Sequence, residues 1–186
     1  MNSPTFSILL LVVATSAFGA EKYSKEVPKV AVPTMVATTI TLDARNVAAG
    51  RVLSDGVAPG PDATRKTTTH SETLEIHVGN LGTLPASVTV HWFWVGRYAT
   101  SGNWYRAGDG EKTLAIDPKK SEVVLAEASD IEGHVTKGSH EHYQSGGNLL
   151  GWVVTVKNSQ AEIQAVKASD AYLEGFAVQE PPKKRK

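Results

Sequence analysis

The residues of this sequence best suited to binding a metal ion are the histidines of Ser139-His140-Glu141-His142. In an extended chain His140 and His142 point to the same side, because side chains two residues apart share a face. Imidazole nitrogens are common zinc ligands, and His134 becomes a third ligand if the chain folds back. Histidines of a solvent-exposed loop give the same pattern. His134, His140 and His142 are therefore metal candidates only, and no cofactor is expected.

Aromatic side chains near residue 100 form a second group that could bind a ligand. Trp104 and Tyr105 lie in a stretch predicted to be a loop, residues 99–110, and Tyr98 comes just before it. Exposed aromatic rings can stack on a sugar ring while neighbouring polar groups bond its hydroxyls. Such a loop can also fold its own rings over the end of the core. Tyr98, Trp104 and Tyr105 are thus the candidate glycan contacts.

A third candidate is an apolar surface on a predicted strand. Phe93 and Val95 point away from Trp92 and Trp94, so this strand is apolar on both faces at one end. A surface of this kind must be covered, either by the N-terminal leader or by another molecule. Phe93, Val95 and the adjacent His91 form the candidate partner interface, for an envelope protein or for a second copy of the chain.

The strand elements that would position these residues are organised around residues 74–98. Two alternating segments are separated by Gly79, Asn80, Gly82 and Pro85, which are typical turn residues. The pattern predicts a central hairpin. The side chains expected in the core are Leu74, Ile76 and Val78 on the first arm, and Val88, Val90, Trp92 and Trp94 on the second.

Further strands are predicted from β-branched runs between turn residues. They lie at residues 34–44, 112–116, 122–126, 149–157 and 162–168, with a turn at Asp117-Pro118-Lys119-Lys120. Loops are predicted at residues 46–63, interrupted at most by a short strand at 51–54, and at residues 129–148. A helical turn capped by Ser169 is expected to bury Leu173 or Phe176. These elements predict one all-β domain over residues 34–177, an antiparallel β-sandwich of about eight strands.

The sequence also resembles a known family. Val78-Gly79-Asn80-Leu81-Gly82, followed by Pro85-Ala86 and the alternating Val88 and Val90, is similar to a pattern of bacterial immunoglobulin-like modules that are often called CARDB-like. The resemblance covers residues 34–168 and implies an immunoglobulin-like sandwich without catalytic residues of its own. Modules of this family serve as spacers, adhesion units or envelope-bound partners.

The N-terminal segment has the composition of a secretory signal peptide. Residues 1–20 contain an apolar run followed by small residues, and they carry no charge. We therefore expect cleavage near residue 20, an extended leader at 21–33 and a secreted or periplasmic protein without a membrane span. The chain has no cysteine, so it has neither a disulfide nor a lipidation site at a cysteine.

Charge and motifs narrow the class of function. The 19 basic residues balance the 19 acidic ones, and four of the basic residues lie in a tail, residues 178–186, that is predicted to be disordered. No nucleic-acid-binding surface is expected. A phosphate-binding glycine loop, a Gly-x-Ser-x-Gly elbow and a His-Glu-x-x-His motif are all missing from the sequence. The sequence predicts a non-catalytic binding or structural module of the bacterial envelope, with glycan binding and metal-dependent activity as the alternatives.

Overall fold

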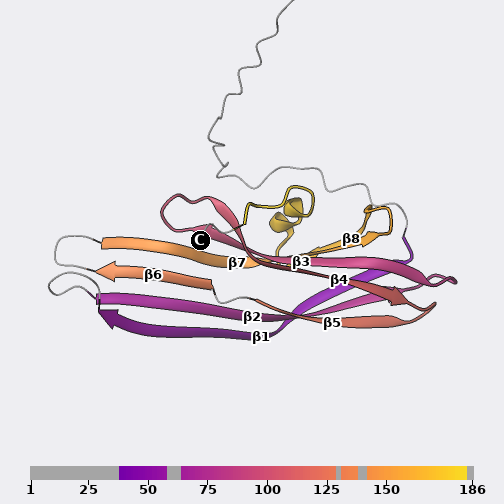
Figure 1. Cartoon of the computed structure of the whole chain (residues 1–186), viewed down its shortest axis with the longest axis horizontal. Coiled ribbons are helices and arrows are strands. Elements are labelled where there is room, and N and C mark those ends of the chain that lie inside the picture. The colour runs from indigo at the N-terminus through magenta and orange to yellow at the C-terminus, as the bar shows by residue number, and fades with distance from the viewer. Residues whose placement is uncertain (1–37, 58–63, 129–130, 138–141, 184–186) are drawn as a thin grey trace, which may run out of the picture.

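The computed structural model describes residues 38–57, 64–128, 131–137 and 142–183 (Figure 1). Within these residues, eight strands are followed by one short 3-10 helix. The elements are β1 (Ile40–Val57), β2 (Thr64–Asn80), β3 (Ala86–Tyr98), β4 (Trp104–Ile116), β5 (Ser121–Glu127), β6 (Ile131–Lys137), β7 (His142–Asn158), β8 (Ile163–Ala168) and η1 (Ala171–Ala177). No helix in this part of the chain is long and apolar enough to cross a membrane.

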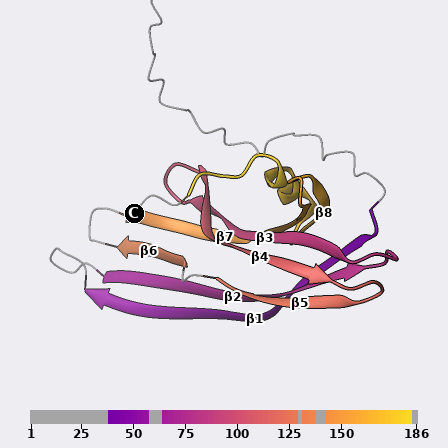
Figure 2. The same ribbon diagram turned by 45° about the vertical axis from the view of Figure 1, so that its right-hand side comes forward.

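The strands form an antiparallel, immunoglobulin-like β-sandwich, which confirms the predicted fold class. β1, β2 and β5 pair in one layer, called sheet A here, and β4, β3, β7 and β8 pair in that order in the other layer, sheet B. β6 pairs with β2 on one side and with β7 on the other, and so joins the two layers. Figure 2 shows sheet A below sheet B, with η1 above sheet B.

The main core lies between the two sheets and contains the side chains expected there. Leu74, Ile76 and Val78 of β2 are fully excluded from solvent, and they pack in one cluster with Val90 and Trp94 of β3. Trp92 packs against the same cluster while remaining half-buried. At about 25 cal/mol per Å² of apolar area removed from water, each buried aromatic ring contributes several kcal/mol.

The predicted hairpin at residues 74–98 is wrong, because β2 and β3 lie in different sheets. β2 pairs with β1, β5 and β6, whereas β3 pairs with β4 and β7. Two strands with one apolar face each can bury those faces by packing across a sandwich, and the sequence pattern is the same in either arrangement. The segment between them, residues 81–85, therefore crosses from one layer to the other.

The second half of β1, the first half of β2, β6 and the start of β7 extend beyond the core and form an arm, seen on the left in Figure 1. A β-bulge between Asn46 and Ala48 marks where β1 leaves the core. The predicted loops at 46–63 and 129–148 are wrong over most of their length, because β1 runs to Val57 and β6 forms a hairpin with the first part of β7. These segments lack a continuous apolar face, the signal on which strand prediction rests, since they extend past the core.

The predicted loop at 99–110 is also mostly a strand. Only residues 99–103 form the turn, in which Gly102 donates its N–H to the carbonyl of Tyr98 at 2.9 Å. The turn at residues 117–120 is confirmed, with Lys119 at a φ of 60°. β8 pairs with β7, so the predicted strand at 162–168 forms a hairpin with the end of the strand at 149–157.

The predicted helical turn is present as η1, although its cap is Asp170 and not Ser169. The Asp170 carboxylate accepts from the N–H of Tyr172, whereas the Ser169 hydroxyl accepts from the N–H of Trp152 on β7. Both Leu173 and Phe176 are buried. Sheet B is therefore covered by the C-terminal part of the chain.

Candidate interaction surfaces

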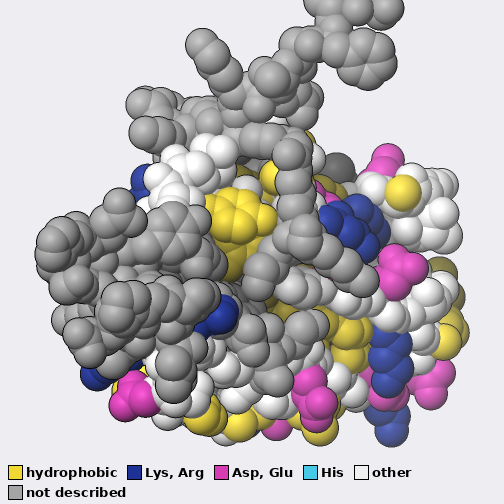
Figure 3. All heavy atoms as spheres, turned by 60° about the vertical axis from the view of Figure 1, so that its left-hand side comes forward, with side chains coloured by type: hydrophobic (Ala, Val, Ile, Leu, Met, Phe, Trp, Pro, Cys, Tyr) yellow, Lys and Arg dark blue, Asp and Glu magenta, His cyan; other side chains and the backbone are white. Residues whose placement is uncertain are grey.

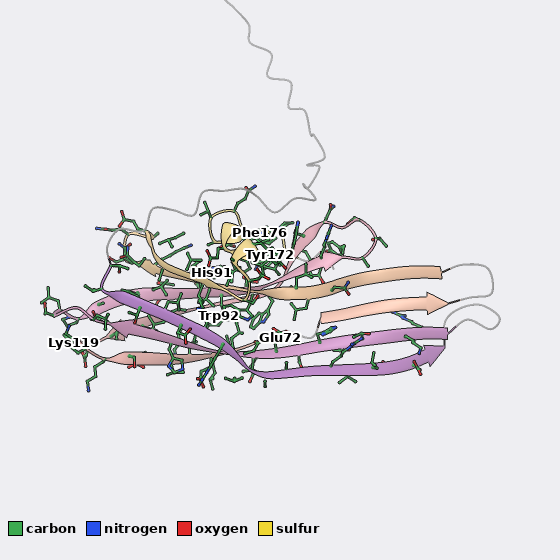
Figure 4. The ribbon with its side chains drawn as sticks, turned by 180° about the vertical axis from the view of Figure 1, so that it is seen from behind. Glu72, His91, Trp92, Lys119, Tyr172 and Phe176 are labelled. Atoms are coloured by element: carbon green, nitrogen blue, oxygen red, sulfur yellow. The ribbon has the colours of Figure 1, made fainter. Side chains whose placement is uncertain are left out.

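The apolar outer face of β3 is covered by η1. Phe93 and Val95 are fully buried in a second cluster with Leu173 and Phe176 of η1 and with Val153 of β7. Figure 4 shows Phe176 and Tyr172 on η1 above the strand that carries His91. The hypothesis that Phe93 and Val95 form a partner interface is therefore wrong. The prediction that this face needs a cover was sound, but the cover is a segment about eighty residues later in the sequence.

His91 lies beside this second core and is largely shielded from solvent. Its ring packs against Phe93 with centroids 5.7 Å apart, and its Nδ1 lies 3.4 Å from a carboxylate oxygen of Glu180. Loss of hydration lowers the pKa of His91 below its usual value, because burial outweighs the opposing attraction of Glu180. The guanidinium of Arg106 also pairs with Glu180. His91 thus belongs to an intrachain contact and not to an exposed interface.

The predicted disordered tail, residues 178–186, is wrong as far as Lys183. The N–H of Arg106 on β4 donates to the carbonyl of Pro182 at 2.7 Å, and Arg106 and Lys183 form an isolated parallel bridge. The amine of Lys183 lies 3.2 Å from a carboxylate oxygen of Asp109. The last three residues lie outside the described part of the chain. The C-terminal segment thereby extends the cover of sheet B to the edge strand β4.

The predicted glycan contacts are mostly buried. Tyr105 is fully excluded from solvent and Trp104 is 9% exposed, while Tyr98 is half-buried. Trp104 packs on Phe176 with ring centroids 5.3 Å apart, and Tyr98 packs on Tyr105 at 4.4 Å. Burial, together with the nearby Tyr98, raises the pKa of Tyr105 to about 12. Stacking of a sugar ring on Trp104 and Tyr105 is therefore contradicted: these rings cover the molecule's own core.

The predicted metal ligands lie largely outside the described residues. This holds for all of His140 and for the side chains of His134 and His142. The backbone of His134 pairs with Ser145, three positions from His142 along β7. Within the described part of the chain, no group of three or more His, Asp or Glu side chains is placed to hold a metal ion.

Two exposed leucines mark the end of the sandwich opposite the arm. Leu84 is 76% exposed and Leu81 is 59% exposed, both in the crossing between β2 and β3. Asn80, which is buried, holds this segment: its Nδ2 donates to the carbonyls of Leu84 at 2.8 Å and Ile116 at 3.1 Å, and its Oδ1 accepts from the N–H of Gly82 at 2.9 Å. The crossing is thus fixed by a buried polar side chain.

The neighbouring turn between β4 and β5 is tied to the same asparagine. The N–H of Asn80 donates to the carbonyl of Lys120 at 2.9 Å, and the N–H of Lys119 donates to the carbonyl of Asn80 at 2.8 Å. The amine of Lys119 donates to the carbonyl of Leu81. Figure 4 places Lys119 at the end of the molecule away from the arm. Both polar groups of the Asn80 backbone and both of its side chain are therefore satisfied.

A second exposed apolar spot lies on the outer face of β5. Leu125 is 66% exposed and Val123 is 46% exposed, whereas the residues that alternate with them, Val124 and Ala126, are buried. Since Gly79, at the end of β2, pairs with the first residue of β5, this strand starts at the same end of the sandwich as Leu81.

Charged residues border this spot on the outer face of sheet A. Leu125 lies opposite Glu75 in the sheet, and Val123 lies opposite His77. The Glu75 carboxylate accepts from the guanidinium of Arg45 at 2.6 Å and lies 2.7 Å from Nε2 of His77. Hydrogen bonds from His77 and from Arg45 lower the pKa of Glu75. The spot is therefore an apolar surface with a polar rim.

The sequence analysis missed these four exposed side chains, although one signal was available. The run Glu122-Val123-Val124-Leu125-Ala126 is apolar on both faces of its strand, as the β3 segment is. That pattern predicts two apolar faces but not which of them another part of the chain covers. The structure answers this question: η1 covers the outer face of β3, while Val123 and Leu125 remain exposed.

Comparisons with known proteins add no family. No protein-family model matches the sequence, and no curated protein matches it either. Similar solved structures include a Bacteroides uniformis beta-glucuronidase 2, with 9% sequence identity and a TM-score of 0.33 over 64% of this chain and 12% of that chain. A protein from Akkermansia muciniphila has 10% identity and a TM-score of 0.30 over 77% of this chain and 78% of its own. A Trichoderma reesei beta-D-glucoside glucohydrolase has 14% identity and a TM-score of 0.29 over 71% of this chain and 18% of its own. This chain thus spans about an eighth of the first. At these TM-scores the similarities carry no argument about function.

Proposed function

We propose that this chain is an exported, non-catalytic, immunoglobulin-like module of the bacterial envelope that binds a protein partner through the apolar side of sheet A. This side comprises Leu81 and Leu84 at the crossing and Val123 and Leu125 on β5.

The observation that carries the proposal is the difference between the two outer faces of the sandwich. The outer face of sheet B is covered by η1 and by the C-terminal segment, so Phe93 and Val95 are fully buried. On the side of sheet A, Leu84 and Leu125 keep most of their surface exposed. Because exposed apolar surface is typical of interaction sites, this side is the better candidate for a partner.

The local structure favours binding because it holds the backbone that carries Leu81 and Leu84 in place. The four hydrogen-bonding groups of Asn80 hold the crossing before any partner arrives. A backbone segment that is ordered in advance loses less conformational entropy on binding. The charged cluster of Arg45, Glu75 and His77 borders the β5 spot and would act as the rim that surrounds the apolar centre of an interface.

The proposal is tested by retention of envelope proteins on the purified protein. Leu84→Asp and the double change Val123→Asp/Leu125→Asp place charges in the proposed contact without touching the core. The matched control is Val178→Asp, since Val178 is 49% exposed and lies just after η1. We expect the two test variants, and not the control, to lose the retained partner while keeping the circular dichroism spectrum of the parent.

Treatment of the extract identifies the kind of partner. Loss of retention after protease treatment, with no effect of periodate, is expected for a protein. Loss after periodate alone would indicate a glycan and overturn the proposal. Equal retention by all variants would show that the side of sheet A is not the contact.

A further inference from the structure

The outer edge of the arm is formed by β1 beyond its bulge, from Ala48 to Val57. This segment pairs with the polar first half of β2, and among the described residues no other strand pairs with it. Figure 1 shows it as the lowest strand of the arm. A strand at the edge of a sheet directs every second pair of N–H and C=O groups away from its neighbour, and these groups are a template for another strand.

The edge lacks two of the features that usually prevent such pairing, proline and lysine residues. Its side chains are exposed from Ala48 to Gly56, and the largest apolar ones are Val52 at 64% and Leu53 at 65% exposed. In Figure 3, apolar and charged side chains are interspersed along the lower rim of the molecule, on the side where β1 lies in Figure 1.

The two charges of this edge are arranged symmetrically about Leu53. Arg51 precedes Leu53 by two residues and Asp55 follows it by two, so all three side chains share one face of the strand. Within the described residues neither charge forms an ion pair, although Arg51 lies opposite His70 and Asp55 lies opposite Lys66 on β2. The opposite charges thus remain available to a strand that pairs with the free edge.

We infer that this edge binds a second copy of the chain, with the two β1 strands antiparallel about a twofold axis at Leu53. Leu53 then faces Leu53 of the copy, and Arg51 of each copy faces Asp55 of the other. The symmetry gives the same charge pair twice. Opposite charges directly across an antiparallel pair stabilise the pairing, and like charges oppose it.

Strand geometry leaves few other registers. In an antiparallel pair, hydrogen-bonded and non-hydrogen-bonded positions alternate along each strand, and a hydrogen-bonded position always faces another hydrogen-bonded position. A residue therefore cannot face the next residue of an identical strand. The twofold axis must then lie between two copies of the same residue. An axis at Arg51 would place two arginines opposite each other, and an axis at Asp55 would place two aspartates opposite each other. An axis at Val52 or Ser54 leaves both charges without an opposite partner. Only an axis at Leu53 pairs them.

The inference uses a surface separate from the proposed partner site and goes beyond that function. Leu81 and Leu84 lie in the crossing, at the end of β2 away from the arm. Val123 and Leu125 lie on β5, which pairs with residues 73–79 of β2 and not with the arm, so all four side chains would remain exposed in this dimer. Two copies joined by their arms would present two partner sites, one on each side of the twofold axis. Either proposal can therefore fail while the other holds.

The test is sedimentation velocity of the purified protein over a range of concentrations. We expect a reversible monomer–dimer equilibrium, because a contact along a single strand edge is a small interface. Arg51→Asp and Asp55→Arg each replace two attractive contacts by repulsive ones, so each variant should dimerise at least about tenfold more weakly. Glu111→Arg, an exposed charge reversal on β4, is the matched control and should dimerise as the parent does.

The decisive experiment is to mix the two single variants. A chain with Asp at positions 51 and 55 is complementary to a chain with Arg at both positions, so the equimolar mixture should form heterodimers although each variant alone dimerises only weakly. The double variant Arg51→Asp/Asp55→Arg should recover the parent's affinity. A parent that stays monomeric at all concentrations, or a mixture that stays monomeric, would overturn the inference. Dimerisation unaffected by either single variant would do so as well.

Discussion

Replacement of Phe93 by alanine tests whether η1 seals the outer face of sheet B. The ring is fully excluded from solvent and packs in one cluster with Leu173 and Phe176. The substitution loses the free energy gained by burying the ring, about 2 kcal/mol. A remaining cavity of about 75 Å³, at about 24 cal/mol per Å³, adds about 2 kcal/mol. The expected loss in the free energy of unfolding is therefore about 4 kcal/mol, a large part of a typical domain's stability.

The assay is equilibrium unfolding in urea, followed by tryptophan fluorescence. The matched control is Leu125→Ala: because Leu125 is 66% exposed, this change should alter the stability by less than about 0.5 kcal/mol. Phe176→Ala should destabilise the protein as well, and the double variant should lose less than the sum, because the two rings share one cluster. A loss at Phe93 no larger than that at Leu125 would refute the packing of η1 on β3.

Three further substitutions test the packing and hydrogen bonds at Asn80, Gly147 and His91. Asn80→Ala removes three hydrogen bonds of a buried side chain and leaves the carbonyl of Ile116 without this donor, so urea unfolding should show a loss of about 2–3 kcal/mol; a loss below about 1 kcal/mol would contradict this role. Gly147→Ala places a Cβ 1.9 Å from the hydroxyl oxygen of Tyr105 and should cost about 1–3 kcal/mol; an unchanged melting temperature would show that the ring does not lie there. For His91 the folded state holds the pKa below the value of 6.5 in the unfolded chain. The unfolded state therefore binds more protons near pH 6, and stability should fall as the pH drops from 7 to 5. His91→Gln should show a weaker decline over this range, and an equal decline would exclude His91 as its source.

The all-β class and the central core followed from the sequence because they rest on local alternation. Apolar residues recur at every second position, at Leu74, Ile76 and Val78, and in a half-buried strand this places all three side chains on the buried face. Turn residues add to this, as the positive φ of Lys119 after Asp117-Pro118 shows. Both signals act over a few residues, so one sequence is sufficient to detect them.

The pairing of strands could not be predicted, because it depends on contacts between distant segments. β2 and β3 alternate as the two arms of a hairpin would, yet they face each other across the sandwich. The cover of Phe93 comes from Leu173 and Phe176, and no local pattern connects these positions. The arm escaped detection because its strands lack a continuous apolar face: β6 pairs with the polar half of β2, and the start of β7 pairs with β6.

The predicted interaction residues were wrong for a related reason. Aromatic and apolar residues indicate where burial or binding occurs, but only the fold decides between the two. Trp104 and Tyr105 are as suitable for stacking on a sugar as for packing on their own core, and the structure buries them. No sequence pattern singled out Leu84 and Leu125, although the fold leaves their side chains exposed.

Site-specific photo-cross-linking in the producing cell tests most directly which face of the sandwich meets a partner. A photoreactive phenylalanine analogue would replace Leu84 or Leu125 on the side of sheet A. In a third variant it would replace Tyr172, which is 43% exposed on η1. We predict a discrete, protease-sensitive adduct with another protein at Leu84 and Leu125, and none at Tyr172. An adduct at Tyr172 alone, or none at any position, would contradict the assignment of the partner site to sheet A.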